Sequence, residues 1–176
     1  ARPLLEEAFR QAGRNAAALE GLRLLGGQPT VAFLEGIAND TGESFRLRSL
    51  AVIGRAKMNP KAGAALALGV LRETPDGRDP HGIFDAFLAN KQGTVELATL
   101  LESESLPEPI ALTGLNKAGS AATRPERLIA ALQKAGGIEP MKMALTDEEM
   151  EAMMDRVARL GDPHRGEKIY RRQALQ

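Results

Sequence analysis

The two histidines of the chain, His81 and His164, are the side chains best suited to bind a metal ion or a haem iron. Each follows an Asp-Pro pair, so both stand in the tripeptide Asp-Pro-His. Aspartate and proline are favoured at helix starts, which would place each histidine at an exposed second position. No second ligand lies at ligand spacing near either histidine. We therefore interpret both as helix-start residues rather than as a ligand pair.

Five methionines lie between Met141 and Met154, and they raise the possibility of a copper site or an axial haem ligand. Met150, Met153 and Met154 instead fit the core spacing of a helix, together with Val157. Methionine is also a common filler of gaps in protein cores. We expect a buried stripe, and we expect replacement of Met154 by alanine to cost about 2–4 kcal/mol.

An acidic run surrounds the start of this stripe, and its members are Asp147, Glu148, Glu149 and Glu151. Negative charge is favourable at a helix N-terminus, which explains the run without a bound cation. Thr146 and Glu149 fit a capping box, in which each side chain bonds the other residue's amide. A calcium loop would need alternating oxygen ligands and a central glycine, and that pattern is missing.

No pattern of residues in the sequence indicates catalytic chemistry. The glycines stand singly or in pairs, so they form no phosphate-binding loop. The chain has no cysteine, which excludes disulfides, thiol nucleophiles and zinc-cysteine sites. No serine has a plausible general base beside it in the sequence. The serines are Ser44, Ser49, Ser103, Ser105 and Ser120. We predict that the chain is not an enzyme and has no catalytic, cofactor-binding or metal-binding residues.

The composition favours helices and excludes two classes of partner. Aromatic residues make up 3% of the 176 residues, so the core must consist of leucine, alanine, isoleucine, valine and methionine. Lysine plus arginine equals aspartate plus glutamate, at 23 each, which argues against a nucleic-acid partner. The longest apolar stretch, 64–71, is far shorter than the roughly 20 residues of a membrane span.

Helical periodicity runs through the whole chain, and no segment shows sustained strand-type alternation. Glycine and proline punctuate the periodic segments, and Ser44 and Asp79 are the expected caps of two helices. The pattern predicts eleven helices, at about 3–12, 16–25, 29–38, 44–57, 60–73, 79–88, 94–102, 107–118, 125–135, 146–160 and 162–170.

Short loops between helices of this length are typical of an α-solenoid built from helix pairs. The pattern A-L-x-G-L-x-x-x-G occurs at 18–26 and again at 111–119. The offset between the copies is 111 − 18 = 93 residues, which is about twice the ~40–47 residue period of HEAT repeats. We predict an all-α fold, an α-solenoid of HEAT-like antiparallel helix pairs.

The last stretch, 161–172, reads Gly-Asp-Pro-His-Arg-Gly-Glu-Lys-Ile-Tyr-Arg-Arg. It resembles the first helix of class I cytochrome c domains, which runs directly into the haem-attachment motif Cys-x-x-Cys-His. The segments 83–87, 106–107, 127–137 and 145–150 follow in an order that is also familiar. They resemble the helical region before the haem domain in multidomain haem-binding proteins of a membrane-bound dehydrogenase type. Those proteins join a β-propeller, HEAT-like helices and a C-terminal haem domain.

The resemblance implies two domains. Residues 1–145 would form a HEAT-like helical repeat domain, and 146–176 a connecting helix followed by the truncated first helix of a cytochrome c-like domain. The chain lacks cysteine, so we expect no cofactor in it, and covalent haem only in a domain that would follow. The implied location is the periplasm or cell envelope, because c-type haem is attached outside the cytoplasm.

The implied function is that of a non-catalytic helical spacer or docking module in an electron-transfer protein. Its partners would be the other domains of the parent protein, a cytochrome c-like domain and a β-propeller. The alternative is a protein-binding HEAT-like scaffold with no redox role. An exposed apolar groove with a polar rim would favour the binding scaffold. A packed surface without a groove would favour the spacer.

Overall fold

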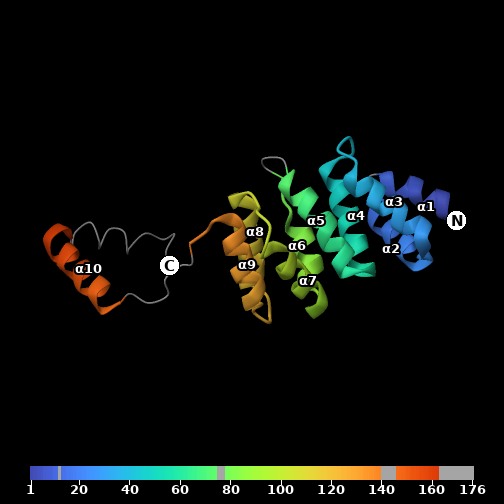
Figure 1. Cartoon of the computed structure of the whole chain (residues 1–176). Coiled ribbons are helices and arrows are strands. Elements are labelled where there is room, and N and C mark those ends of the chain that lie inside the picture. The colour runs from blue at the N-terminus through green and yellow to red at the C-terminus, as the bar shows by residue number, and fades with distance from the viewer. Residues whose placement is uncertain (12, 75–77, 140–145, 163–176) are drawn as a thin grey trace. The chain divides into compact units, whose positions relative to one another are not determined.

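The computed structural model describes residues 1–11, 13–74, 78–139 and 146–162. Over these residues the chain is helical and has no strand, so the prediction of an all-α fold is confirmed (Figure 1). The helix expected at 162–170 falls almost wholly outside the described residues. The helices are α1 (Arg2–Arg10), α2 (Asn15–Leu25), α3 (Gly27–Asn39), α4 (Phe45–Met58), α5 (Pro60–Arg72), α6 (His81–Leu88), α7 (Lys91–Leu101), α8 (Glu108–Gly119), α9 (Glu126–Gly136) and α10 (Asp147–Leu160).

The chain divides into two compact units. The first, Ala1–Glu139, contains α1 to α9, and the second, Pro140–Gln176, contains α10. The break follows Gly137, which ends α9 in the left-handed conformation with φ of 62°. Glycine adopts this conformation without the steric cost that a side chain would add, so it is well suited to end the helix.

The helix start predicted at Ser44 is present, whereas α6 begins at His81 and has Pro80 rather than Asp79 at its N-cap position. The Ser44 hydroxyl accepts a 3.3 Å hydrogen bond from the Leu47 amide in the first turn of α4. The Asp79 carboxylate accepts a 2.8 Å hydrogen bond from the His81 amide, where α6 begins. Each side chain satisfies an N–H group that has no partner within its helix.

The start of α7 was predicted at Thr94 and lies three residues earlier, at Lys91. The reason is Asn90, whose side-chain oxygen accepts a 2.6 Å hydrogen bond from the Gly93 amide. Asparagine is among the strongest N-cap residues, so it begins a helix ahead of the first apolar position. This shift brings Lys91 into the first turn of α7.

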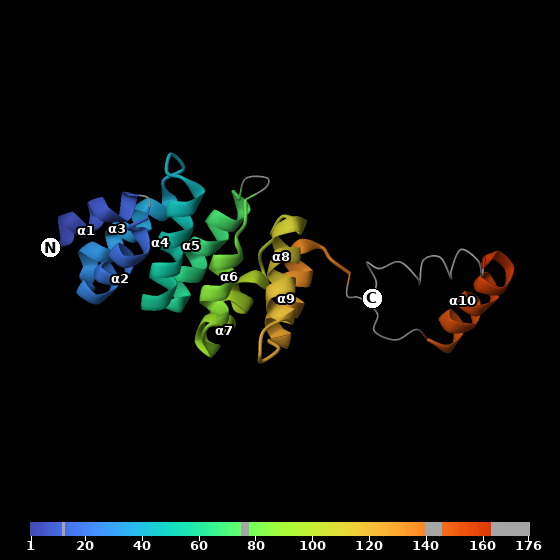
Figure 2. The same cartoon turned by 180° about the vertical axis from the view of Figure 1, so that it is seen from behind.

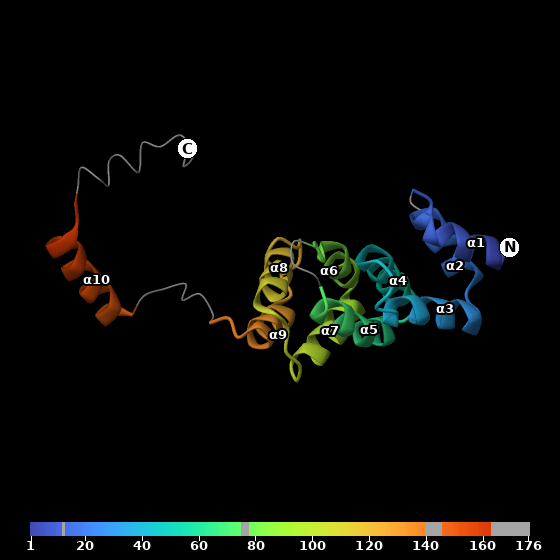
Figure 3. The same ribbon diagram turned by 90° about the horizontal axis from the view of Figure 1, so that it is seen from above.

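The helices of the first unit lie in two rows, which Figure 3 shows from above. Helices α2, α4, α6 and α8 contact one another in that order, and α3, α5, α7 and α9 do the same. The sequential pairs α4–α5, α6–α7 and α8–α9 join the two rows. Figure 2 shows that the helices follow one another in chain order from the N-terminal end of the unit to α9. Each helix of a row therefore packs against the next helix but one.

The core of the first unit consists mainly of leucine, alanine, isoleucine and valine, as predicted. Three of the five phenylalanines, Phe9, Phe84 and Phe87, are fully buried and are among its largest side chains. Methionine contributes less than predicted, since Met58 is only partly buried at the edge of this core. Small side chains dominate the remaining contacts, which allows neighbouring helices to approach closely.

The two copies of the repeated sequence pattern place a glycine at a tight contact. A Cβ atom at Gly21 in α2 would lie 2.9 Å from a methyl carbon of Leu5. A Cβ atom at Gly114 in α8 would lie 2.8 Å from a ring carbon of Phe84. Both helices belong to the same row. The glycine of the shared pattern therefore marks a position where a side chain of another helix occupies the space that a Cβ atom would fill.

Arg48 links three helices of the first unit through its buried guanidinium. Its Nε donates a 2.9 Å hydrogen bond to the Ala38 carbonyl near the end of α3. Its Nη2 donates a 2.7 Å hydrogen bond to the Glu73 carboxylate, which follows α5. A buried arginine needs such partners, because an unpaired charge away from water is costly.

The apolar face of α10 is exposed, which contradicts the predicted buried stripe. Met150, Met153 and Met154 are 46%, 49% and 66% exposed, and Val157 and Leu160 are more than half exposed. Among the described residues of the second unit, no other helix accompanies α10. Periodic spacing reveals that a helix has an apolar face, but it does not reveal whether a partner covers that face.

The predicted capping box at the start of α10 is only partly described. The Thr146 carbonyl accepts a 2.8 Å hydrogen bond from the Met150 amide, so the first turn of the helix forms. The side chain of Glu149 lies outside what the structure describes. The reciprocal pair of side-chain bonds between Thr146 and Glu149 therefore stays a prediction.

Candidate functional site

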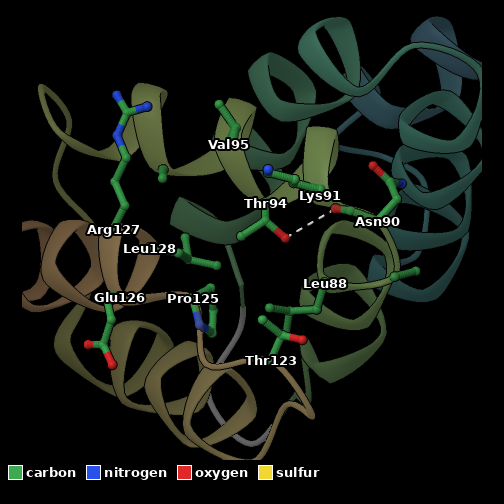
Figure 4. A pocket seen from close by; sticks show the side chains of 12 residues that line it. Leu88, Asn90, Lys91, Thr94, Val95, Thr123, Pro125, Glu126, Arg127 and Leu128 are labelled. Carbon is green, nitrogen blue, oxygen red and sulfur yellow. Dashed lines mark hydrogen bonds between the residues drawn. The ribbon is translucent and has the colours of Figure 1, made fainter.

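A hollow of about 530 Å³ lies where α7 and α9 begin, and we call it the α7–α9 hollow (Figure 4). Its lining runs from the end of α6 through the first turns of α7 to the loop and first turn of α9. Pockets of about 300–1,000 Å³ are typical of sites that bury most of a small ligand. The hollow is therefore large enough to receive one or more side chains of a partner.

Aliphatic side chains form the walls of the α7–α9 hollow. Ala98 and Leu128 are each 1% exposed, so they belong to the core as well as to the hollow. Leu88, Val95 and Pro125 are more accessible and lie nearer its mouth. Figure 4 shows Leu88 and Leu128 on opposite sides of the open space. Such walls favour an apolar group, because burying apolar surface gains about 25 cal/mol per Å².

Hydrogen bonds fix the turn between α6 and α7, which forms one side of the hollow. The Thr94 hydroxyl donates a 3.1 Å hydrogen bond to the Asn90 carbonyl, which Figure 4 shows as a dashed line, and it also lies 3.1 Å from the Phe87 carbonyl oxygen, to which it donates as well. The Asn90 side chain in turn accepts from the Gly93 amide. These contacts join the last turn of α6 to the first turn of α7, so the protein's own hydrogen bonds hold this wall in place.

An ion pair crosses the rim beside the hollow. Arg127 donates two hydrogen bonds to the Glu102 carboxylate, of 2.7 Å and 3.0 Å. The hydrogen bond from Arg127 lowers the pKa of Glu102 below the usual glutamate range, and the same contact raises the pKa of Arg127. Lys134 adds a 2.7 Å hydrogen bond to the Glu102 backbone carbonyl. In Figure 4 the Arg127 side chain extends away from the hollow.

The remaining charges of the rim are Lys91 and Glu126. Glu126 pairs with Arg124 at 3.1 Å, and its side chain also extends away from the hollow (Figure 4). Lys91 is exposed at the start of α7 and forms no ion pair with any residue that the structure describes. The lining therefore offers one cation that no described carboxylate neutralises.

A second, smaller hollow of about 280 Å³ lies between α4 and the start of α6. Phe45, Leu50 and Ile53 provide its apolar lining, and Arg46 and Asp79 are among its polar residues. Arg46 donates a 3.3 Å hydrogen bond to Asn15. Asp79 is engaged at the start of α6. The Asp79 carboxylate and the Arg46 guanidinium already have hydrogen-bond partners within the protein. The smaller hollow is therefore a weaker candidate for a binding site.

The two histidines are not brought into a common site among the described residues. The Nδ1 atom of His81 lies 2.9 Å from the Asp79 carboxylate, and both side chains are largely exposed. His164 lies outside the described residues, as do Met141 and Met143. In the part of the chain that the structure describes, no three histidine or carboxylate residues gather as metal ligands. The predicted absence of a metal or haem site stays a prediction.

The serines support local backbone structure. The Ser44 hydroxyl caps α4, and those of Ser49, Ser103 and Ser120 donate to the backbone carbonyls of Phe45, Leu100 and Lys117. These bonds tie each hydroxyl to its own helix or to the turn that follows. The serine contacts do not test whether the chain is an enzyme, so the expectation that it is not one stays a prediction.

Sequence reasoning did not single out the α7–α9 hollow. Its lining comes from two segments, 88–98 and 123–128, that lie about thirty residues apart in the chain. The sequence contained two signals, an N-cap asparagine at Asn90 and a helix-starting proline at Pro125. They predict where two helices begin. They do not predict that both starts lie side by side, because that depends on the packing of α7 against α9.

Comparison of the chain with models of known protein families, with curated proteins and with solved structures found no match. The resemblance of 161–172 to cytochrome c domains therefore stays a prediction. Among the helices that the structure describes, none combines the length and apolar character that crossing a membrane requires. The geometry of the first unit is therefore the basis on which a function is proposed below.

Proposed function

We propose that the chain is a protein-binding helical scaffold, and that the α7–α9 hollow receives an aliphatic side chain of a partner protein. The observation that carries the proposal is the hollow, which combines apolar walls with a polar rim. A packed surface would have favoured a spacer, whereas a hollow of this kind favours binding. The role requires no catalytic residue and no cofactor in this chain.

The proposal treats the first unit as a short α-solenoid of HEAT-like antiparallel helix pairs. It is supported by the contacts of each helix with the next but one, and by the pairs α4–α5, α6–α7 and α8–α9. The glycines shared by the two pattern copies also support it, since each lies in a close contact between helices, Gly21 with Leu5 of α1 and Gly114 with Phe84 of α6. Stacked helix pairs expose an extended surface on which partners bind. The hollow would be one site on that surface.

Selection of peptides tests the binding role directly. Random linear peptides displayed on phage are selected against the full chain, and the affinities of the enriched peptides are measured on purified variants. Val95→Trp places a larger side chain at the mouth of the hollow, at a position that is already 36% exposed. We expect this variant to weaken binding by about tenfold or more, which corresponds to about 1.4 kcal/mol.

Leu112→Trp is the matched control, because Leu112 is 42% exposed on α8 and does not line the hollow. This variant should bind the selected peptides as the unchanged chain does. Thermal unfolding of both variants checks that the fold is retained. If Val95→Trp binds as tightly as Leu112→Trp, or if no peptide is enriched, the hollow is not a protein-binding site.

A second candidate function is the spacer in a multidomain haem protein. It is favoured by the separate second unit that begins at Pro140, and by the resemblance of 161–172 to a cytochrome c helix. In that role the chain would hold a cytochrome c-like domain relative to a β-propeller, in the periplasm or cell envelope. Haem staining and intact mass of the full-length gene product test it. A product without covalent haem would eliminate this role.

A further inference from the structure

We infer that the α7–α9 hollow selects a partner segment in which an aliphatic side chain stands next to a carboxylate. The inference rests on the proposed binding function and adds the chemistry of the partner. The apolar walls specify the aliphatic part. The charges at the rim specify the carboxylate.

The apolar requirement follows from the walls. Ala98 and Leu128 are the buried members of the lining, and neither offers a side-chain polar group. The Thr94 hydroxyl already donates to two backbone carbonyls, so its proton is not available to a partner. A polar group placed deep in the hollow would lose its hydrogen bonds to water without replacement, which is unfavourable. An aliphatic side chain loses nothing comparable.

The sign of the charge at the rim follows from the ion pairs. Both carboxylates nearby are neutralised, Glu102 by Arg127 and Glu126 by Arg124. Lys91 has no such partner among the described residues. The charge that a bound segment meets at the mouth is therefore positive, and a carboxylate there would complement it.

The directions of the two helices add to this positive potential. Both α7 and α9 present their N-terminal ends to the hollow, where unpaired amide groups give each helix a partial positive charge. The N-terminus of α7 is capped by Asn90, whereas no side chain caps α9. The amide groups at the start of α9 can therefore donate hydrogen bonds to an anion, and the one carboxylate in this turn, Glu126, is paired with Arg124. Apolar walls beside these groups strengthen the attraction, because they lower the local dielectric constant.

Two small molecules of equal shape separate the two requirements. Isocaproate carries a branched aliphatic chain and a carboxylate, and isocaproamide carries the same chain and a neutral amide. Each is titrated into the isotopically labelled full chain, and the backbone amide shifts are followed by NMR. We expect both to shift the amides of Leu88, Val95 and Leu128. We expect isocaproate to bind about fivefold more tightly at low salt, the combined effect of one exposed cation and two helix ends.

Substitution of the unpaired cation tests the source of the preference. Lys91→Gln should reduce the preference for isocaproate to about twofold, since the helix ends remain. Lys61→Gln is the matched control, because Lys61 lies exposed in the first turn of α5 behind another asparagine cap, Asn59. This control should keep the full preference. Raising the salt concentration should weaken the binding of isocaproate and leave that of isocaproamide unchanged.

The outcomes distinguish this inference from the function on which it rests. Equal binding of the two molecules in the hollow would refute the charge preference and leave the binding role intact. A preference that Lys91→Gln and Lys61→Gln reduce equally would also refute it. Shifts confined to other surfaces, or none, would refute the inference as a whole. The binding role itself fails if no peptide is enriched, or if the selected peptides bind Val95→Trp as tightly as Leu112→Trp.

Discussion

Gly63 in α5 lies against the backbone of Ala56 in α4, so closely that the glycine hydrogen occupies the only space available. A Cβ atom at position 63 would lie 2.6 Å from the Ala56 nitrogen and would overlap its Cα and Cβ as well. Backbone atoms of a packed helix cannot move aside as the end of a flexible side chain can. The close approach of α4 to α5 therefore depends on this glycine. Because α4 lies in one row of the first unit and α5 in the other, the same contact joins the two rows.

Gly63→Ala should destabilise the first unit by about 1–3 kcal/mol, because overpacking outweighs the better helix propensity of alanine. Gly69→Ala, in the same helix, is the control, since nothing lies within 4 Å of a Cβ atom there. That change should stabilise by about 0.5–1 kcal/mol. Urea unfolding followed by circular dichroism gives both values. Equal effects at the two positions would mean that α4 and α5 are not in such close contact.

Thr30 in α3 offers a gain in stability. Its side chain is fully buried, and its hydroxyl has no hydrogen-bond partner among the described residues. Thr30→Val removes this unsatisfied group at nearly constant shape, so it should stabilise by about 1 kcal/mol. Thr99→Val is the control, because the exposed Thr99 hydroxyl donates a 2.8 Å hydrogen bond to the Val95 carbonyl. Calorimetric melting should show a higher Tm for the first variant alone, and a lower Tm for Thr30→Val would reveal a partner.

The Glu102 carboxyl should titrate below the usual glutamate range, because Arg127 donates to both of its oxygens. A lowered folded pKa stabilises the fold at higher pH. The contribution is lost as the pH falls from about 4.3, the ordinary value, through the lower folded pKa. The effect on stability is small because the pair is exposed to solvent. Carbon NMR of the side-chain carboxyls measures the titration.

Arg127→Gln should return the pKa of Glu102 toward the usual range. Glu20 provides an internal control, because its lowered pKa comes from hydrogen bonds with Arg23 and Lys57, in another part of the unit. The Glu20 titration should not change in the variant. A Glu102 titration that also stays unchanged would show that the Arg127 contact does not persist in solution.

The helices of this chain were predictable because their signals are local. Each expected helix that falls in the described residues is present, and Ser44 begins α4 through the bond that its sequence position indicated. The start of α7 differs from the predicted one because the Asn90 cap begins the helix three residues ahead of the apolar periodicity. The start of a helix is set by its N-cap residue, so a strong cap residue is a better predictor of the start than the first apolar position.

The α7–α9 hollow was not predictable from the sequence, because it depends on packing between distant segments. Lys91 and Leu128 are ordinary helix residues in sequence, and only the contact of α7 with α9 places them on one hollow. Ion pairs between distant segments were not predictable from the sequence for the same reason. Nothing near Glu102 in the sequence indicates that Arg127, 25 residues later, is its partner.

Met154 is the residue at which the predicted and observed environments differ most. The helical spacing of the α10 methionines predicted a buried stripe and a cost of about 2–4 kcal/mol for Met154→Ala. The side chain is 66% exposed, so we now expect a change of no more than about 0.5 kcal/mol. Alanine and methionine both favour helices, so α10 itself should persist.

Leu132→Ala is the comparison for Met154→Ala, because Leu132 in α9 is fully buried and its truncation leaves a cavity. That change should cost about 2–5 kcal/mol. Urea unfolding of the full chain, followed by circular dichroism, should show a lower midpoint for Leu132→Ala and the original midpoint for Met154→Ala. A cost near that of Leu132→Ala would mean that another surface covers the apolar face of α10 in solution. The covering surface would then have to bury Met154, Val157 and Leu160 together, because the three lie on the same face of the helix.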